Sequence, residues 1–163
     1  MPQKVKSGNP SRLRRSGNGS RAPRANNIRD VMTPDPRVLE PDASITDAAN
    51  LMRESDIGDI VVVEDNRLSG ILTDRDIVVR VLAEGYDPAA ITVGDICSRE
   101  ITAISASSSV DDALKLIRDR AIRRLPVIDD DGGVVGIVTI GDIARARDRS
   151  SALADVSAAP PNT

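Results

Sequence analysis

The sequence has no histidine, tryptophan or phenylalanine, and only one cysteine (Cys97) and one tyrosine (Tyr86). Without histidine there is no imidazole base and no Cys/His zinc site, and a lone cysteine forms no internal disulfide. The chain also lacks the aromatic platforms on which nucleic-acid readers stack bases, and it has no P-loop motif. We therefore expect no enzyme, no catalytic residue and no metal site.

Long apolar runs are missing too, so the sequence predicts neither a membrane span nor a signal peptide. We expect a cytoplasmic protein that makes no membrane contact. The 163 residues are 40% apolar and 29% charged, which is typical of a soluble globular chain with one ordinary domain or two small ones.

Acidic residues are absent from the first 26 positions, which hold seven basic side chains among Ser, Gly, Asn and Pro. This composition predicts a disordered basic tail over 1–26, and the Ala/Ser/Pro segment 150–163 predicts a second disordered tail. The basic tail is either a phosphate-binding arm for nucleic acid or a solvated segment with no folded role.

The middle of the chain contains an internal repeat. At an offset of 65 residues, which becomes 66 after one inserted residue, fourteen positions are identical within fewer than fifty aligned positions. The identical pairs include Ser44 and Ser109, Gly70 and Gly136, and Asp76 and Asp142. Such a register predicts two structural copies, 27–86 and 87–149.

Each copy predicts the order strand, helix, strand, strand, helix, so the fold class is α/β of the α+β type. Short strands at 37–39 and 102–104 lead to Ser44 and Ser109, each followed three residues later by an acid that completes a capping box. Apolar residues at helical spacing predict one buried stripe per copy: Ile45, Ala48, Ala49 and Met52, then Val110, Ala113, Leu114, Ile117 and Ala121. Two β-branched runs joined by a turn predict a hairpin in each copy: 60–63 with 68–72, and 125–128 with 134–138.

The last helix of the first copy is apolar on more than one face over 77–82. A second burial surface is expected there. Because closed two-fold pairing is the commonest way to cover such a face, we expect a homodimer.

The assembled pattern resembles tandem cystathionine-β-synthase (CBS) domains, as found in small stand-alone bacterial proteins. The motifs that carry the resemblance are GILTDRDI at 70–77, GIVTIGDI at 136–143, the lead-in DVMTP at 30–34 and the strand IRRLPVI at 122–128. The resemblance spans roughly 28–148. It implies a Bateman module, in which two copies related by a pseudo-two-fold axis enclose two clefts. In many members these clefts bind AMP, ADP, ATP or S-adenosylmethionine, and no cofactor is required.

The candidate ligand residues lie where the second hairpin strand of each copy ends and a helix begins. Thr73 and Thr139 stand at that junction, where hydroxyls and backbone amides favour an anion. Asp76 and Asp142 follow three residues later and are suited to accept from ribose hydroxyls. Thr-x-x-Asp is equally a capping box in which both side chains bond only to helix amides. The family's Ser/Thr-x-x-Asp contacts ribose and phosphate, which favours ligand contact in the second copy.

The two clefts are expected to be unequal. Arg123 and Arg124 stand in the second copy where the first has Gly58 and Asp59, so a nucleotide is expected to prefer the cleft of Thr139 and Asp142. In the first copy Arg75 either compensates in part or is a solvated helix residue. The purine is expected between aliphatic side chains, and the candidates are Val38, Ile60, Ala103 and Leu125.

The favoured hypothesis is a regulatory module that binds an adenosyl ligand between its copies and signals to an unidentified effector protein. The alternative is a nucleic-acid-associated dimer that uses the basic tail, with the CBS pair as its scaffold. A steep salt dependence of binding that disappears when 1–26 is deleted would favour the alternative.

Overall fold

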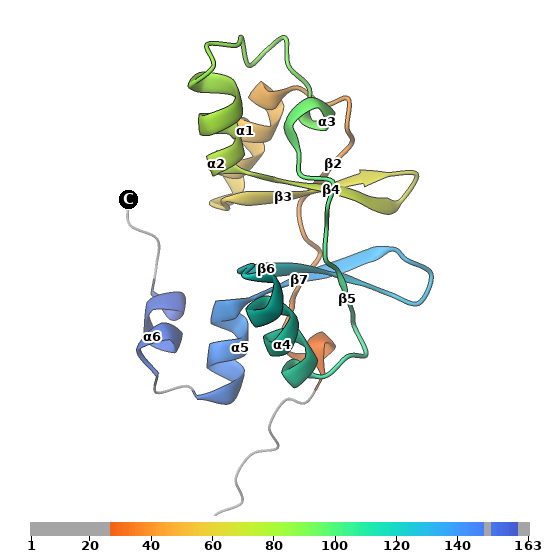
Figure 1. The fold of residues 1–163 in the computed structure, drawn as a ribbon, viewed down its shortest axis with the longest axis vertical. Helices are drawn as coiled ribbons and strands as arrows, with labels where there is room; N and C mark the ends of the chain where they lie inside the picture. Colours follow the sequence, from red (N-terminus) through yellow and green to blue (C-terminus); the bar gives the residue numbers. More distant parts are fainter. Residues whose placement is uncertain (1–26, 149–150, 160–163) are drawn as a thin grey trace, which may run out of the picture.

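The computed structural model describes residues 27–148 and 151–159, which form two similar α/β units. In Figure 1 the hairpins of the two units lie at the centre of the molecule, and the helices of each unit lie on its outer side. Each unit therefore packs its helices against the outer face of its own sheet, and the inner faces of the two sheets are turned toward one another. The predicted α/β class with two β-α-β-β-α copies is confirmed.

The first unit contains a three-stranded sheet. β2 (Val38–Leu39) runs parallel to β3 (Asp59–Glu64), which pairs antiparallel with β4 (Arg67–Thr73). α1 (Ile45–Ser55) joins β2 to β3, and α2 (Asp74–Ile77) follows β4 directly. The sequence order of the elements is thus the predicted one.

The second unit repeats this plan. β5 (Ile104–Ser105) runs parallel to β6 (Arg124–Ile128), which pairs antiparallel with β7 (Val134–Thr139). α4 (Val110–Arg120) joins β5 to β6, and α5 (Ile140–Arg147) follows β7. The expected strand at 102–104 is observed as Ile104–Ser105, beginning two residues later and ending one residue later. The other strands and helices lie where the repeat placed them.

The short segments that precede each unit cross over to the other one. η1 (Ile28–Asp30) and β1 (Thr33–Pro34) belong to the second unit: Ile28 is fully buried in its core, and β1 pairs antiparallel with β7. Conversely, α3 (Val93–Ile96) contributes both of its end residues to the core of the first unit.

The boundaries 27–86 and 87–149 follow the repeat along the sequence, while the lead-in of each copy packs into the core of the other. Each lead-in carries apolar side chains that are buried there, Ile28 in the second unit and Val93 and Ile96 in the first. Ile28 donates its N–H to the Ser108 carbonyl at 2.9 Å, which fixes the first crossover. This exchange ties the two units together.

Serine caps begin the first helix of each unit, as the sequence predicts. Ser44 Oγ accepts the Asp47 N–H at 3.0 Å, and Ser109 Oγ accepts the Asp112 N–H at 3.1 Å. In α4 the Asp112 carboxylate also accepts the Ser109 N–H at 3.2 Å, which completes the reciprocal box. A cap of this kind stabilises a helix by about 1 kcal/mol.

The predicted apolar stripes are confirmed except at two alanines. In α1 the residues Ile45, Ala48 and Met52 are buried, and α4 buries its equivalents. Ala49 is exposed because it lies one helical step beyond Ala48. Ala121 is exposed as well, since it ends α4 in the left-handed conformation with a φ of 52°.

The C-terminal segment corrects the expectation of a disordered tail over 150–163. Residues Ala152–Ala158 form a helix, α6, whose cap Ser151 accepts the Ala154 N–H at 3.2 Å. Figure 1 shows α6 beside α5, and Ala154 is only 2% exposed. The remaining predicted tail positions, 1–26 and 160–163, lie outside the described residues. Within the part of the chain that is described, no helix is long and apolar enough to cross a membrane.

Candidate ligand site between the repeats

A cavity of about 540 Å³ lies where the two units meet. Its walls come from three places: the end of β4 and the start of α2, the segment before β5, and the start of β6. The lining residues are Ile71, Thr73, Asp74 and Arg75, then Glu100, Ile101 and Thr102, and finally Ile122, Arg123, Arg124 and Pro126. A ligand held here would contact both repeats at once.

Two of the basic side chains in this cavity are free to bind an anion. Arg75 and Arg123 are both exposed, and among the described residues neither guanidinium has a carboxylate partner. Asp74 and Glu100 supply the acidic groups of the cavity lining. The Asp74 carboxylate is partly engaged, since it accepts the Arg75 backbone N–H at 2.7 Å.

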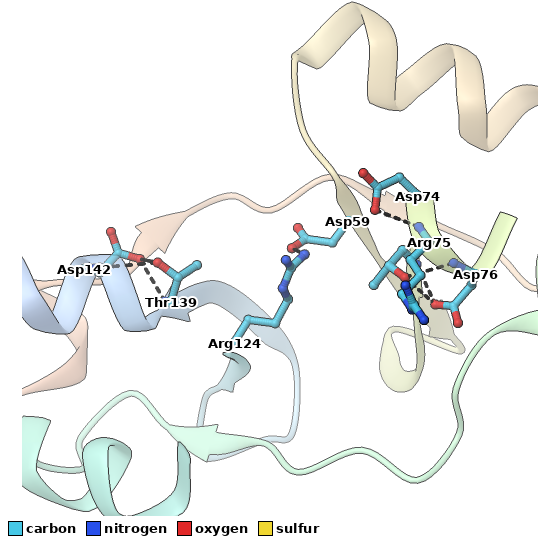
Figure 2. Close-up of polar contacts among 8 residues, drawn as sticks. Asp59, Asp74, Arg75, Asp76, Arg124, Thr139 and Asp142 are labelled. Atoms are coloured by element: carbon cyan, nitrogen blue, oxygen red, sulfur yellow. Dashed lines mark hydrogen bonds and ion pairs between the residues drawn. The ribbon is translucent and has the colours of Figure 1, made fainter. Parts of the chain in front are cut away.

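The third basic side chain, Arg124, forms an ion pair with Asp59 across the two units, as Figure 2 shows. Asp59 stands at the start of β3 and Arg124 at the start of β6, so the pair joins the inner edges of the two sheets. Partial burial lowers the pKa of the Arg124 guanidinium, because desolvation penalises its charge. The repeat register assigned Asp59 and Arg124 to different clefts, but in the structure each neutralises the other.

Thr73 and Asp76 form a complete capping box at the start of α2. The Asp76 Oδ2 atom accepts from the Thr73 N–H at 3.0 Å and from the Thr73 hydroxyl at 2.6 Å. The other carboxylate oxygen lies 3.4 Å from the Arg80 Nε atom. Thr73 lines the cavity and Asp76 does not.

Thr139 and Asp142 repeat this arrangement at α5 (Figure 2). The Asp142 Oδ2 atom accepts the Thr139 N–H at 2.8 Å and its hydroxyl at 2.7 Å, while Oδ1 pairs with Arg145. Both carboxylate oxygens are thus in use inside the protein, and the Asp142 side chain is only 5% exposed. The structure shows the capping interpretation, and ligand contact by these residues stays a prediction.

Arg123 and Arg124 lie beside the start of α5, as expected: Arg124 is the register partner of Thr139, and the Arg123 carbonyl accepts the Ile140 N–H at 2.9 Å. Arg123 and Arg124 share the cavity with Thr73, whereas Thr139 and Asp142 are not among its lining residues. The basic pair therefore adjoins the helix start of its own repeat and also lines the cavity with Thr73 of the other, and the expected preference for Thr139 and Asp142 stays a prediction.

The predicted purine platform is also corrected. Ile60 and Leu125 are 1% and 0% exposed and pack into the two helix-side cores. Val38 is 43% exposed on β2 and Ala103 is partly buried, and neither lines the cavity.

The apolar wall of the cavity comes instead from Ile71, Ile101, Ile122 and Pro126, which sequence reasoning missed. Two of these four residues, Pro126 and Ile71, could have been predicted from the sequence. Side chains on a strand alternate between faces, so a core-facing Leu125 places Pro126 on the inner face. Ile71 follows by the same rule from the fully buried Leu72.

Comparison with known proteins agrees with this geometry. A sequence model of the CBS domain matches residues 28–83 and again 93–149. The chain belongs to the CBS domain family.

Two curated relatives are covered over about four fifths of their own length. The CBS domain-containing protein YhcV of Bacillus subtilis is 39% identical over 117 residues, which is 72% of this chain and 82% of that protein. Hypoxic response protein 1 of Mycobacterium tuberculosis is 41% identical over 118 residues, with the same two coverages of 72% and 82%. Neither is named as an enzyme, and CBS pairs are in general regulatory rather than catalytic.

Solved structures give the same fold. A crystal structure of CBSX2 in complex with AMP has a TM-score of 0.63 and 31% identity, covering 74% of this chain and 94% of that one. The crystal structure of Hypoxic Response Protein I holds two coordinated zinc ions and has a TM-score of 0.65 and 40% identity, with coverages of 73% and 97%. A hexameric CBS-CP12 protein from cyanobacteria has a TM-score of 0.65 and 28% identity, with coverages of 76% and 72%. In the described residues of the present chain, no three Cys, Asp or Glu side chains are placed to hold a metal ion.

Proposed function

We propose that this CBS pair is a regulatory module that binds an adenosyl ligand in the cavity between its repeats and signals to an effector protein. The observation that carries the proposal is the cavity itself, which brings Thr73 of one repeat together with Arg123 of the other. A ligand that bridges two units favours the arrangement in which both can contact it. Binding can then change how the module presents itself to a partner.

The shape and polarity of the cavity suit a nucleotide. Its volume of about 540 Å³ is within the ordinary range for small-molecule sites. The isoleucines and Pro126 supply an apolar wall for the purine, while Arg75 and Arg123 can bind a phosphate with charge-assisted hydrogen bonds. The AMP complex of CBSX2 supports the same ligand class.

The charges favour a single phosphate. Arg75 and Arg123 are free, but Asp74 and Glu100 also line the cavity, and Arg124 is already paired. Each further phosphate would add negative charge next to these carboxylates. Among the family ligands we therefore expect AMP to bind more tightly than ADP or ATP, and S-adenosylmethionine, which lacks a phosphate, to bind weakly.

Titration calorimetry with AMP, ADP, ATP and S-adenosylmethionine tests the proposal. Arg123→Ala removes a charge-assisted contact worth about 1.5 to 3 kcal/mol, so AMP should bind roughly tenfold to a hundredfold more weakly. Arg118→Ala is the control, since this arginine is exposed on α4 and does not line the cavity. Failure of wild type to bind AMP, or equal affinity in both variants, would contradict the proposal.

A homodimer is proposed on a different observation. Val78, Val79 and Leu82 in the π-helical turn η2 (Val78–Leu82) are 55%, 46% and 56% exposed, while Ile77 and Val81 fill the core of their own unit. The apolar face predicted over 77–82 is therefore present, and a second copy of the chain would cover it. The hexameric CBS-CP12 neighbour shows that such a pair can assemble.

Sedimentation equilibrium tests the dimer. Val79→Asp should convert it to the 17.3 kDa monomer, while Val38→Asp, at an exposed position on β2, should leave it intact. A wild-type monomer at micromolar concentration would end this proposal.

Catalysis by Cys97 is disfavoured. Burial raises the pKa of its thiol, which opposes formation of the reactive thiolate. Its Sγ atom packs so closely on Gly70 that a β-carbon there would lie 2.7 Å away. The nucleic-acid alternative depends on residues 1–26, which lie outside the described residues, and the comparisons do not favour it. The cytoplasmic location stays a prediction.

A further inference from the structure

The C-terminal helix α6 packs on the start of α5. A β-carbon built on Gly141 would lie 2.8 Å from the Ser157 β-carbon, so this glycine is what allows α6 to approach. The Arg145 Nη1 atom, whose guanidinium also pairs with Asp142, lies 3.5 Å from the Ser157 carbonyl. Ala154 is the buried residue of α6 in this contact.

The repeat shows what α6 covers. At the offset of 66, Gly141 corresponds to Arg75 and Thr139 to Thr73, and both of those first-repeat residues line the open cavity. By the pseudo-two-fold relation of the repeats, α6 therefore lies where the second repeat would contribute to an equivalent cavity. The aspartates differ accordingly: the Asp76 side chain is 16% exposed and that of Asp142 is 5%.

We propose that α6 is a displaceable cover over a second ligand position, which is bounded by Thr139 and Gly141. This inference rests on the proposed function, because it takes the cavity at Thr73 as the first ligand position. With α6 in place, the module offers a ligand only that first position. Movement of α6 changes the number of sites from one to two.

The second position differs from the first in charge. Where the cavity has Arg75, Arg123 and Arg124, the repeat register places Gly141, Gly58 and Asp59. The nearby Arg145 is held by Asp142. Asp59 is already paired with Arg124, and the one arginine that the register adds is Arg37, at the place of Thr102, which donates to the Ser55 Oγ atom at 3.1 Å. The second position thus lacks the two unpaired arginines of the first, so we expect it to take an adenosyl compound that lacks a phosphate group.

Displacing α6 from α5 requires little free energy. α6 has seven residues, which is too short to be stable without its packing, and it buries one side chain. Its other apolar residues, Leu153 and Val156, are 43% and 72% exposed. A ligand or partner that binds only the open form can therefore shift the equilibrium toward it.

The test opens α6 in the full chain by two independent routes. Ala154→Glu places a charge at the 2% exposed contact, and Val156→Pro breaks the helix at a residue that is 72% exposed. Ala152→Glu is the matched control, because this alanine lies on the exposed side of α6. Hydrogen exchange of the α6 amides shows whether the helix has opened, and calorimetry measures adenosine binding to protein saturated with AMP.

Both opened variants should bind one more adenosine per chain than wild type, with an apparent affinity at least about tenfold higher at the second position. Ala152→Glu should behave as wild type. No gain after α6 opens, or a second adenosine bound equally by wild type, overturns the inference. If AMP fails to bind but the opened variants still gain adenosine, the proposed function fails and the cover stands.

Discussion

The two repeats follow the same chain path but present different surfaces at the start of their second helices. In the first, Arg75 lies at the mouth of an open cavity, whereas in the second Gly141 lies beneath α6. One side chain and one added helix account for the difference, since the capping boxes behind them are alike. Duplication of a fold thus need not duplicate a binding site.

The residues that follow the start of these helices also differ between the two repeats. Val78, Val79 and Leu82 of the first repeat are exposed, and the aligned residues of the second are Ala144, Arg145 and Asp148. The apolar surface for a second copy therefore lies on the first repeat. The second repeat uses the corresponding region for α6.

The largest loss of stability is expected from a substitution inside one of the two hydrophobic cores. Leu125→Ala should destabilise the protein by about 3 kcal/mol, because it leaves a cavity in a fully buried cluster. AMP affinity of the folded protein should stay unchanged, measured by calorimetry at a temperature where the variant is folded. A specific loss of AMP binding would return Leu125 to the ligand wall.

A reciprocal pair of variants then separates capping from binding. Asp142→Ala removes a buried carboxylate that caps α5 and pairs with Arg145, so it should cost about 2 kcal/mol of stability. Asp76→Ala should cost about 1 kcal/mol. It should also weaken AMP binding, because it frees the Thr73 hydroxyl that Asp76 orients at the cavity.

Chemical denaturation and AMP titration of both proteins measure the two effects. Sequence reasoning alone expected the opposite, with the larger loss of nucleotide binding from Asp142→Ala. That outcome would show that the ligand sits at α5 after all.

The repeat made most of the fold predictable, because hydrophobic spacing and caps are local signals that Ser44 and Ser109 carry within four residues. The exchange of lead-ins was not predictable, since Ile28 packs into the core of the second unit, which is distant in sequence, and the first unit has a similar core. The repeat register also predicts that Arg124 lies beside Thr139, its partner in the sheet. That Arg123 shares a cavity with Thr73 of the other copy depends on how the two units pack, which no local signal in the sequence encodes.

Breaking the ion pair between Asp59 and Arg124 should have a smaller effect on AMP binding, and it should strengthen binding rather than weaken it. Asp59→Asn frees the Arg124 guanidinium toward the cavity, so AMP should bind roughly threefold to tenfold more tightly. Stability should fall by about 1 kcal/mol, because Arg124 loses its partner while about a third of its side chain is exposed. Asp42→Asn, at an exposed site before α1, makes the same charge change as a control. Unchanged or weaker AMP binding by Asp59→Asn would show that Arg124 does not reach the ligand.

The smallest expected effect concerns the capping box at the start of α4, the first helix of the second repeat. The hydrogen bonds from the Ser109 hydroxyl and N–H lower the pKa of Asp112 below its ordinary 3.8. A carboxylate whose pKa is lower in the folded state stabilises the fold fully above its unfolded pKa, and this contribution is lost as the pH falls through the folded pKa. The loss of melting temperature caused by Asp112→Ala should therefore be larger at about pH 7 than at about pH 2.5. Asp119→Ala is the control, because it removes the same charge near the other end of α4 and should not show this pattern. An equal loss of melting temperature for Asp112→Ala at both pH values would mean that the capping box does not act through the ionised carboxylate.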